Sequence, residues 1–268
     1  MTKPIYIHDK KELEKYLLKN SQLNFYHIGD LDDFFWPYTS WLASKENGEI
    51  QALLLLYSGV FPVVLLAIEN NNPKEMRDLL KASLPILPQN LYCHLSPGLE
   101  EIFMEDYNLE HHGEHYSMGL TSPEKLELFD TENVVSVNHE HLSEIQELYT
   151  ASYPRNWFNP RMLETGQYVG IRDAESKLIS VAGIHVYSPT YRVAALGNIT
   201  THPAKRAQGL GTIISAGLCK KLLENVDSIG LNVKADNQAA IHTYEKIGFK
   251  KMAVYHEWTI TSPKKEEL

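Results

Sequence analysis

Cysteine is scarce in this chain, which has only Cys93 and Cys219 among its 268 residues. Small secreted proteins that depend on disulfides carry many more cysteines at short spacings. We therefore expect two reduced, partly buried thiols and no disulfide framework.

Positive charge is scarce as well. The chain has 25 Lys and Arg residues against 34 Asp and Glu residues, which gives a formal net charge of -9 and a pI near 5.7. A nucleic acid or an anionic membrane would require a basic face on its partner, so we expect neither as a partner. The acidic balance is only weak support for a cationic substrate.

Long apolar runs are missing too. The most apolar stretch, ALLLLYSGVFPVVLLAI at 52–68, is interrupted by Ser58, Gly59 and Pro62, and it is too short for a membrane-spanning helix. It predicts two buried strands joined by a turn. The first residues, MTKPIYIHDKKELEKYL, lack the apolar core flanked by positive charge that is typical of a signal peptide. We expect a soluble, cytoplasmic protein.

The second half of the chain alternates between helical and strand patterns. Leu142, Ile145 and Leu148 recur at helical spacing, and Gly248 follows a helical pattern in the way that C-terminal glycines do. This order predicts an α/β fold with one central mixed sheet. After the first helix, the expected elements are strands at 167–173, 177–188 and 191–201, a helix at 212–226, a strand at 228–235, a helix at 238–247 and a strand at 249–260.

The first half shows a looser version of the same order, which predicts a degenerate internal repeat. We expect two tandem units, 1–130 and 131–268, joined by the polar segment TSPEKLELFDTEN at 121–133. The expected elements of the first unit are a helix at 10–18, a strand meander over 39–70, a helix at 73–84, a strand at 91–96, a helix at 98–107 and a strand at 114–120.

The string HHGEH at 111–115 matches the zinc-protease pattern H-x-x-E-H. That chemistry needs a helix that places both histidines on one face, and Gly113 lies in the centre of the string. No third ligand follows. We therefore predict a polar hairpin turn here and no metal site.

The string RAQGLG at 206–211 precedes a helical pattern and follows a strand pattern. Backbone N–H groups at such a helix start, together with the helix dipole, form a cradle for an anion, and Gly209 and Gly211 leave the backbone open to a phosphate. A Walker loop would require GxxxxGK[ST], and a dinucleotide fingerprint would require a third glycine; both are missing. A helix start that binds nothing is the remaining alternative.

The string ITTHPAKRAQGLGT resembles the acetyl-CoA-binding signature Q/R-x-x-G-x-G/A of the GNAT superfamily of N-acetyltransferases, with Arg206, Gly209 and Gly211 at its three defining positions. A second block, NQAAIHTYEKIGF at 237–249, is similar to the N-x-x-A-x-x-x-Y-x-K-x-G-F block of the same superfamily. The resemblance covers about residues 134–260. It implies two tandem GNAT-like units, of which the first is degenerate because it has no such glycine string.

The resemblance also implies a site for acetyl-CoA. In this fold the fourth and fifth strands separate, the pantetheine arm lies between them, and a backbone N–H polarises the thioester carbonyl. The resemblance assigns the backbone of the fourth strand to the arm and the amides after it to the pyrophosphate. The implied cofactor-binding residues are Ile199, Thr200, Thr201, Arg206, Ala207, Gln208, Gly209, Leu210, Gly211, Thr212, Asn237, Ala240 and Tyr244.

Tyr244 is the first candidate for chemistry, because a positioned phenol matches the basicity of the thiolate that leaves. Its alternative role is packing on the sheet. Many relatives carry a glutamate on the fourth strand, but RVAALGNIT contains no acid. Asn198 is a candidate for ordering a water, and His185 on the neighbouring strand has a suitable pKa or is a half-buried strand residue. The general base stays unassigned.

The aromatic residues after the first helix of the second unit lie on the acceptor side of such sites. Tyr153, Trp157 and Phe158 are the predicted substrate-binding residues, and an aromatic hinge against the first unit is the alternative. The resemblance implies transfer of an acetyl group from acetyl-CoA to a primary amine by direct attack. A different acyl group, an oxygen acceptor, and a CoA-binding sensor without turnover remain alternatives.

Overall fold

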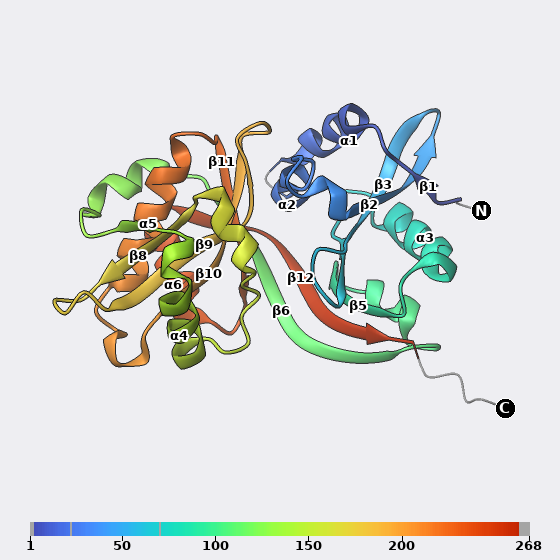
Figure 1. Cartoon of the computed structure of the whole chain (residues 1–268). Helices are drawn as coiled ribbons and strands as arrows, with labels where there is room; N and C mark the ends of the chain where they lie inside the picture. Colours follow the sequence, from blue (N-terminus) through green and yellow to red (C-terminus); the bar gives the residue numbers. More distant parts are fainter. Residues whose placement is uncertain (1–2, 22, 70, 263–268) are drawn as a thin grey trace.

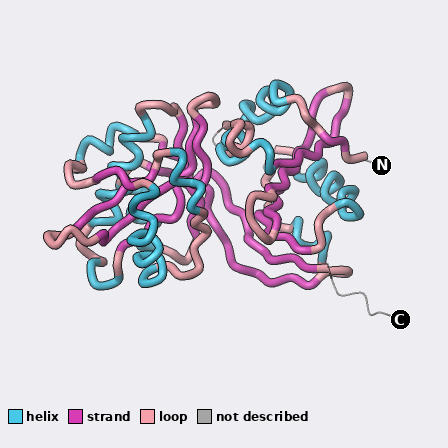
Figure 2. Tube along the Cα trace, in the orientation of Figure 1, coloured by secondary structure: helices cyan, strands magenta, loops and turns pink. Residues whose placement is uncertain are grey.

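The computed structural model describes residues 3–21, 23–69 and 71–262 of the chain. Within these residues the strands form one mixed sheet in the order β1-β2-β3-β4-β5-β12-β6-β11-β10-β9-β8-β7. Helices cover the sheet within two lobes, one for each half of the chain (Figures 1 and 2). The sequence-based prediction of one mixed sheet is confirmed.

The first lobe follows the order that the sequence predicts, with β1 and a short α2 added. Strands β2, β3 and β4 contain runs of consecutive buried residues, whereas β5 alternates buried with more exposed positions. Helix α3 starts at a proline, which fits the first turn of a helix. Its elements are β1 (Ile5–Tyr6), α1 (Lys10–Leu17), α2 (Phe25–Gly29), β2 (Thr39–Glu46), β3 (Glu49–Tyr57), β4 (Val63–Ala67), α3 (Pro73–Ser83), β5 (Asn90–Leu95) and β6 (Asn108–Leu120).

The second lobe repeats this order. The cap residues agree with the sequence patterns, since Asn237 caps α6 with its side chain and Gly248, at φ +110°, follows the end of that helix. Its elements are β7 (Val135–Val137), α4 (Leu142–Ser152), β8 (Tyr168–Arg172), β9 (Leu178–Ser188), β10 (Val193–Thr201), α5 (Leu210–Leu223), β11 (Ser228–Lys234), α6 (Gln238–Lys246) and β12 (Phe249–Thr261).

The two lobes exchange their last strands. β12 lies between β5 and β6, and β6 lies between β12 and β11, with every pair antiparallel. In Figure 1 the green β6 and the red β12 run side by side from one lobe to the other. Residues 115–119 of β6 therefore pair with β11 of the second lobe, and residues 256–261 of β12 pair with β5 of the first lobe.

The predicted hairpin turn at HHGEH is wrong, because these residues lie inside β6. Gly113 takes a φ of +108° beside an irregularity in the register between β6 and β12. A glycine accommodates such a bulge while β6 stays paired with β12 before and after it. The helix predicted at 98–107 is also reduced, since only a 3₁₀ turn forms at Leu99–Phe103.

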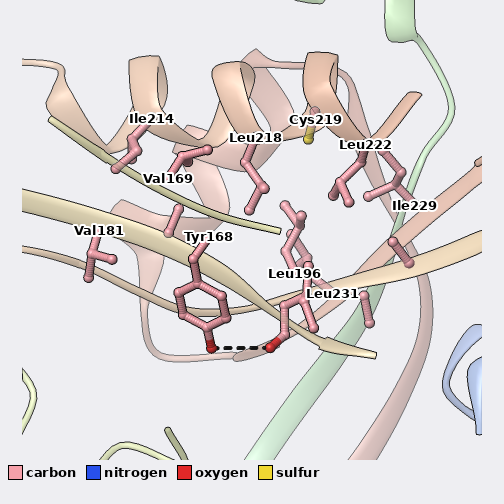
Figure 3. Close-up of a cluster of buried hydrophobic side chains, with 14 of the residues drawn as sticks. Tyr168, Val169, Val181, Leu196, Ile214, Leu218, Cys219, Leu222, Ile229 and Leu231 are labelled. Carbon is pink, nitrogen blue, oxygen red and sulfur yellow. Dashed lines mark hydrogen bonds between the residues drawn. The ribbon is translucent and has the colours of Figure 1, made fainter. Parts of the chain in front are cut away.

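The main core of the second lobe lies between α5 and the sheet. Ile214, Leu218 and Leu222 of α5 are fully buried and face side chains of β8, β10 and β11, as Figure 3 shows. Helix α2 of the first lobe packs on β10 and β11, with Phe25 against Gly230, where a Cβ would come within 2.5 Å of its ring. Cys93 and Cys219 are buried free thiols. No helix in the described part of the chain is long and apolar enough to cross a membrane.

Candidate functional site

Strands β10 and β11 separate partway along their length. They pair in parallel from Val193 with Ser228 to Leu196 with Leu231, and beyond this point β10 pairs with β9 while β11 pairs with β6. The corresponding strands of the first lobe, β4 and β5, stay paired from Val63 to Ala67. An opening between parallel strands therefore exists in the second lobe and not in the described strands of the first.

A bulge in β10 marks this opening. The register with β9 shifts between Gly197 and Thr200, and Asn198 takes a φ of +54°. The Tyr149 hydroxyl donates to the Asn198 carbonyl at 2.7 Å, and Asn198 Nδ2 donates to the Tyr168 hydroxyl at 3.3 Å. A bulge leaves backbone groups outside the ladder. The two tyrosines thus fix the backbone at the point where the strands diverge.

The glycine string forms an open cradle at the N-terminus of α5. Gly209 is the N-cap at φ +78°, and Ala207 also has a positive φ of +61°. Within the described residues, the N–H groups of 207–211 donate no hydrogen bond, whereas Thr212 donates to the Gly209 carbonyl at 3.0 Å. A Cβ at Gly209 or Gly211 would meet no atom within 4 Å. Unpaired amides at a helix start fit an anion such as a phosphate.

The Arg206 side chain connects the loop before the cradle to two neighbouring elements. Its Nε donates to the Thr201 carbonyl at 3.2 Å, and its Nη2 donates to the Ser152 carbonyl at 3.0 Å. The guanidinium therefore ties the loop to the end of β10 and to the end of α4. A direct contact between Arg206 and a phosphate stays a prediction.

Tyr244 lies on α6, which packs against α5 and β12. The Asn237 side chain accepts from the Ala240 N–H at 3.2 Å and so caps the helix. Tyr244 packs against Phe249, with 5.9 Å between ring centroids. Burial raises the pKa of the Tyr244 phenol, so the group keeps its proton at neutral pH, as a proton donor must.

His185 lies directly over the bulged strand. A Cβ at Gly197 would come within 2.2 Å of the His185 ring, and the ring of Tyr26 from α2 lies 6.4 Å away. Burial lowers the pKa of His185 to about 4. The imidazole is therefore neutral at pH 7 and has a free lone pair.

The three predicted acceptor residues separate into two groups. Phe158 packs between Tyr149 and Tyr168, with centroid distances of 5.1 and 5.6 Å. Tyr153 and Trp157 stay 40% and 38% exposed, and the Trp157 ring lies 4.9 Å from that of Tyr92 on β5. The segment therefore combines exposed aromatic surface with a contact to the first lobe.

A cluster of polar side chains that the sequence analysis missed lies between the lobes. We call it the Glu257 cluster: Glu257, Tyr92, His94, His115 and Tyr255. Glu257 Oε1 accepts from the Tyr255 hydroxyl at 3.0 Å and lies 3.4 Å from His94 Nε2. Glu257 Oε2 accepts from the Tyr92 hydroxyl and lies 3.4 Å from His115 Nε2.

The Glu257 side chain is only 12% exposed. Burial by itself would raise its pKa, but the two histidines and the two phenol hydroxyls more than offset this effect, so the pKa lies below its ordinary value. The carboxylate is therefore ionised at neutral pH. A sequence signal did exist for one of them, since His94 stands alone among apolar and aromatic residues of its strand, but Glu257 follows His256 and nothing local pairs the two.

The Glu257 cluster contacts one predicted acceptor residue, because the ring of Tyr92 lies 4.9 Å from that of Trp157. Besides burial, the charge of Glu257 raises the pKa of Tyr26 and of Tyr153, and it opposes the lowering of the His185 pKa. These groups come from α2, from the segment after α4 and from β9. The carboxylate is therefore near enough to all three elements to act on them electrostatically.

The family-model match lies in the second lobe. Residues 168–259 match the family model described as FR47-like protein. The chain is 31% identical over 97 residues to a mycothiol acetyltransferase of Tsukamurella paurometabola, across 35% of this chain and 33% of that protein. It is 30% identical over 105 residues to a mycothiol acetyltransferase of Rhodococcus erythropolis, across 37% and 33%. The chain thus spans about a third of the length of these relatives.

Solved structures resemble the whole chain. A Drosophila protein superposes with a TM-score of 0.74 at 12% identity, across 99% of this chain and 100% of that one. A tandem GNAT protein from the clavulanic acid biosynthesis pathway has a TM-score of 0.56 at 14% identity, across 99% and 100%. A GCN5-related N-acetyltransferase from Sphaerobacter thermophilus has a TM-score of 0.59 at 10% identity, across 97% and 96%. At these identities the likeness concerns the fold, and it confirms the predicted pair of GNAT-like units.

Proposed function

We propose that this chain, a member of the GNAT superfamily of N-acetyltransferases, is an acyltransferase that uses an acyl-CoA through its second lobe. The observation that carries the proposal is the opening between β10 and β11, with the bulge at Asn198 and the free amides of 207–211 beside it. The first lobe keeps β4 and β5 paired throughout, so we assign it no acyl-CoA site. We keep the division into 1–130 and 131–268 as part of this proposal.

The residues of the second lobe fit the acyl donor in two places. The amides of 207–211 would hold the pyrophosphate at the positive end of α5. The backbone of β10 at Ile199, Thr200 and Thr201 would pair with the pantetheine arm, and Asn237 and Ala240 would flank it. The donor supplies an activated thioester, and we propose that its acyl group is acetyl.

We propose a primary amine as the acceptor, which attacks the thioester directly. A backbone N–H at the bulge polarises the carbonyl, and Tyr244 donates the proton that the leaving thiolate requires. Tyr153 and Trp157 line the acceptor side with exposed aromatic surface. The two free thiols and the acidic charge support a cytoplasmic enzyme that acts on a small molecule or a peptide amine.

A CoA-binding sensor is the second candidate function. It is favoured by the composition of β10, whose residues 193–201 contain no carboxylate that could act as a base. A sensor would bind CoA tightly without turnover on any amine.

The test of the acyl-CoA site is calorimetric titration with acetyl-CoA, with release of CoA followed in the same samples. We expect micromolar binding by the wild type and its loss in Gly209→Trp, because the indole would fill the cradle. Gly48→Trp is the matched control, since Gly48 has a similar φ of +83° and equally open surroundings in the turn between β2 and β3. The proposal fails if millimolar acetyl-CoA gives no binding heat, or if both variants bind like the wild type.

A further inference from the structure

The proposed function leaves the proton acceptor for the amine unassigned, and β10 supplies no acid. Resting on that function, we propose that His94 of the first lobe, oriented by Glu257, accepts the proton that the acceptor amine loses. The first lobe would then contribute the base of a site whose acyl-CoA cradle lies in the second lobe.

The strand exchange is what brings the two residues together. Glu257 of β12 stands directly opposite His94 of β5 in the antiparallel register, and β12 reaches β5 only because it crosses into the first lobe. His94 Nε2 lies 3.4 Å from Glu257 Oε1. The carboxylate therefore faces one nitrogen of the ring and favours a proton on that nitrogen.

The other nitrogen of His94 has no partner. Nδ1 is buried and makes no hydrogen bond with any described residue. Burial lowers the pKa of His94, although Glu257 opposes this effect, so the imidazole is neutral at pH 7. With the proton on Nε2, Nδ1 presents a lone pair. A carboxylate that orients a histidine whose second nitrogen is free has the arrangement of a general base.

The remaining partners of Glu257 hold the carboxylate in place. His115 Nε2 lies 3.4 Å from Glu257 Oε2, and His115 Nδ1 lies 3.1 Å from the Gly113 carbonyl. The rings of His94 and His115 stack on Tyr255 at 5.0 and 5.5 Å. His115 has an acceptor at both nitrogens, which leaves His94 as the histidine of the cluster with a free one.

The cluster contacts one predicted acceptor residue and acts electrostatically on the histidine that lies over the bulge. Tyr92, which donates to Glu257, contacts the ring of Trp157, and His94 influences the pKa of His185, whose ring lies over Gly197 beside the bulge. Titratable groups from several elements act on His94. Glu257 of β12, His115 of β6, His27 of α2 and His185 of β9 interact with it electrostatically, and the rings of Tyr92 and Tyr255 lie 5.8 and 5.0 Å from its ring.

The proton balance of the step is complete. The acceptor arrives as R–NH₃⁺ and gives one proton to His94 Nδ1, so that its nitrogen lone pair can form the C–N bond. The C–S bond breaks, its electron pair stays on sulfur, and the Tyr244 hydroxyl protonates the thiolate. Tyr244 regains the second proton that the new amide nitrogen releases, and His94 gives up its proton once the products have left the site. One proton is released overall for each amide formed.

The first experiment measures the titration of His94 by NMR in the full chain, with the signals assigned by His94→Asn. We expect Glu257→Gln to lower the pKa of His94 by about 1 unit, because the carboxylate stabilises the protonated ring. Glu110→Gln is the matched control, since Glu110 is an exposed carboxylate of β6 opposite Thr259. An unchanged His94 titration in Glu257→Gln would overturn the proposed pairing, whether or not the chain is an enzyme.

The second experiment compares two nucleophiles with acetyl-CoA as the donor. Benzylamine is protonated at neutral pH and needs a base, whereas hydroxylamine is already deprotonated and needs none. We expect His94→Asn and Glu257→Gln to slow transfer to benzylamine by about 10²- to 10⁴-fold and transfer to hydroxylamine by less than threefold.

An equal loss with both nucleophiles, or no loss with either, would overturn the base and leave a structural ion pair. A wild type that does not bind acetyl-CoA would instead refute the proposed function, while the His94 titration would still report on the cluster. Melting temperatures within a few degrees of the wild type show that each variant is folded.

Discussion

Replacement of Tyr149 by phenylalanine tests how the bulge in β10 is held. The Tyr149 hydroxyl donates to the Asn198 carbonyl at 2.7 Å, and the two residues are only 3% and 5% exposed. Phenylalanine keeps the ring and leaves no cavity, so the change removes one hydrogen bond from a buried carbonyl. An unsatisfied buried acceptor costs about 1–3 kcal/mol, and we expect the free energy of unfolding to fall by about 2 kcal/mol.

The same change should also reduce turnover. Asn198 at φ +54° is in the left-handed region, which costs roughly 1–3 kcal/mol for a residue other than glycine. The hydrogen bond from Tyr149 offsets a strain of similar size, and without it the bulge populates other conformations. We expect kcat to fall by roughly tenfold, the equivalent of about 1.4 kcal/mol, while the affinity for acetyl-CoA stays within a few-fold.

Urea denaturation and steady-state kinetics measure the two effects. Tyr107→Phe is the matched control, because the described residues give its hydroxyl no hydrogen bond and its ring packs on Phe103. A Tyr149→Phe variant as stable as the wild type would refute the contribution of this bond. A variant that is destabilised but turns over normally would refute the link between the bulge and catalysis.

Three further predictions concern separate parts of the chain. Tyr244→Phe should lower kcat by roughly ten- to a thousandfold with acetyl-CoA affinity within a few-fold, and unchanged turnover removes its role as the acid. His27 is 4% exposed, and burial lowers its pKa from 6.5 to about 4 in the folded chain. Because the unfolded chain binds this proton at a higher pH than the folded chain does, the free energy of unfolding decreases as the pH falls from 6.5 to 4. His27→Leu should flatten that part of a stability curve measured by urea denaturation at each pH, and a curve parallel to the wild type would contradict this. Gly248→Ala should lower the free energy of unfolding by more than about 2 kcal/mol in the same assay, because its Cβ would lie 2.2 Å from the Ser122 carbonyl oxygen. The control Gly48→Ala should lower it by only about 1 kcal/mol, for the positive φ of Gly48. Equal losses in the two variants would refute the steric argument.

The local signals of the sequence determined the elements of the second lobe. The spacing of Leu142, Ile145 and Leu148, the cap at Asn237 and the stop at Gly248 each act within a few residues, and the helices form there. The same holds for the glycine string, because the positive φ of Gly209 at the helix start is a local feature that glycine permits. A glycine loop can therefore be located without knowledge of its neighbours in space.

Only the tertiary structure decided which strands pair and which distant side chains meet. The alternation in β6 and β12 predicts strands, but the choice of neighbours, and hence the exchange between lobes, depends on pairings between residues far apart in the chain. For the same reason HHGEH looked like a turn, since its pairing with β12 is invisible in the sequence. His94, His115 and Glu257 come from three strands, and their meeting follows from a register that no local pattern specifies. The residues of the cradle are adjacent in the sequence, so the sequence alone indicates them. The residues of the Glu257 cluster are far apart in the sequence, and only the folded chain brings them together.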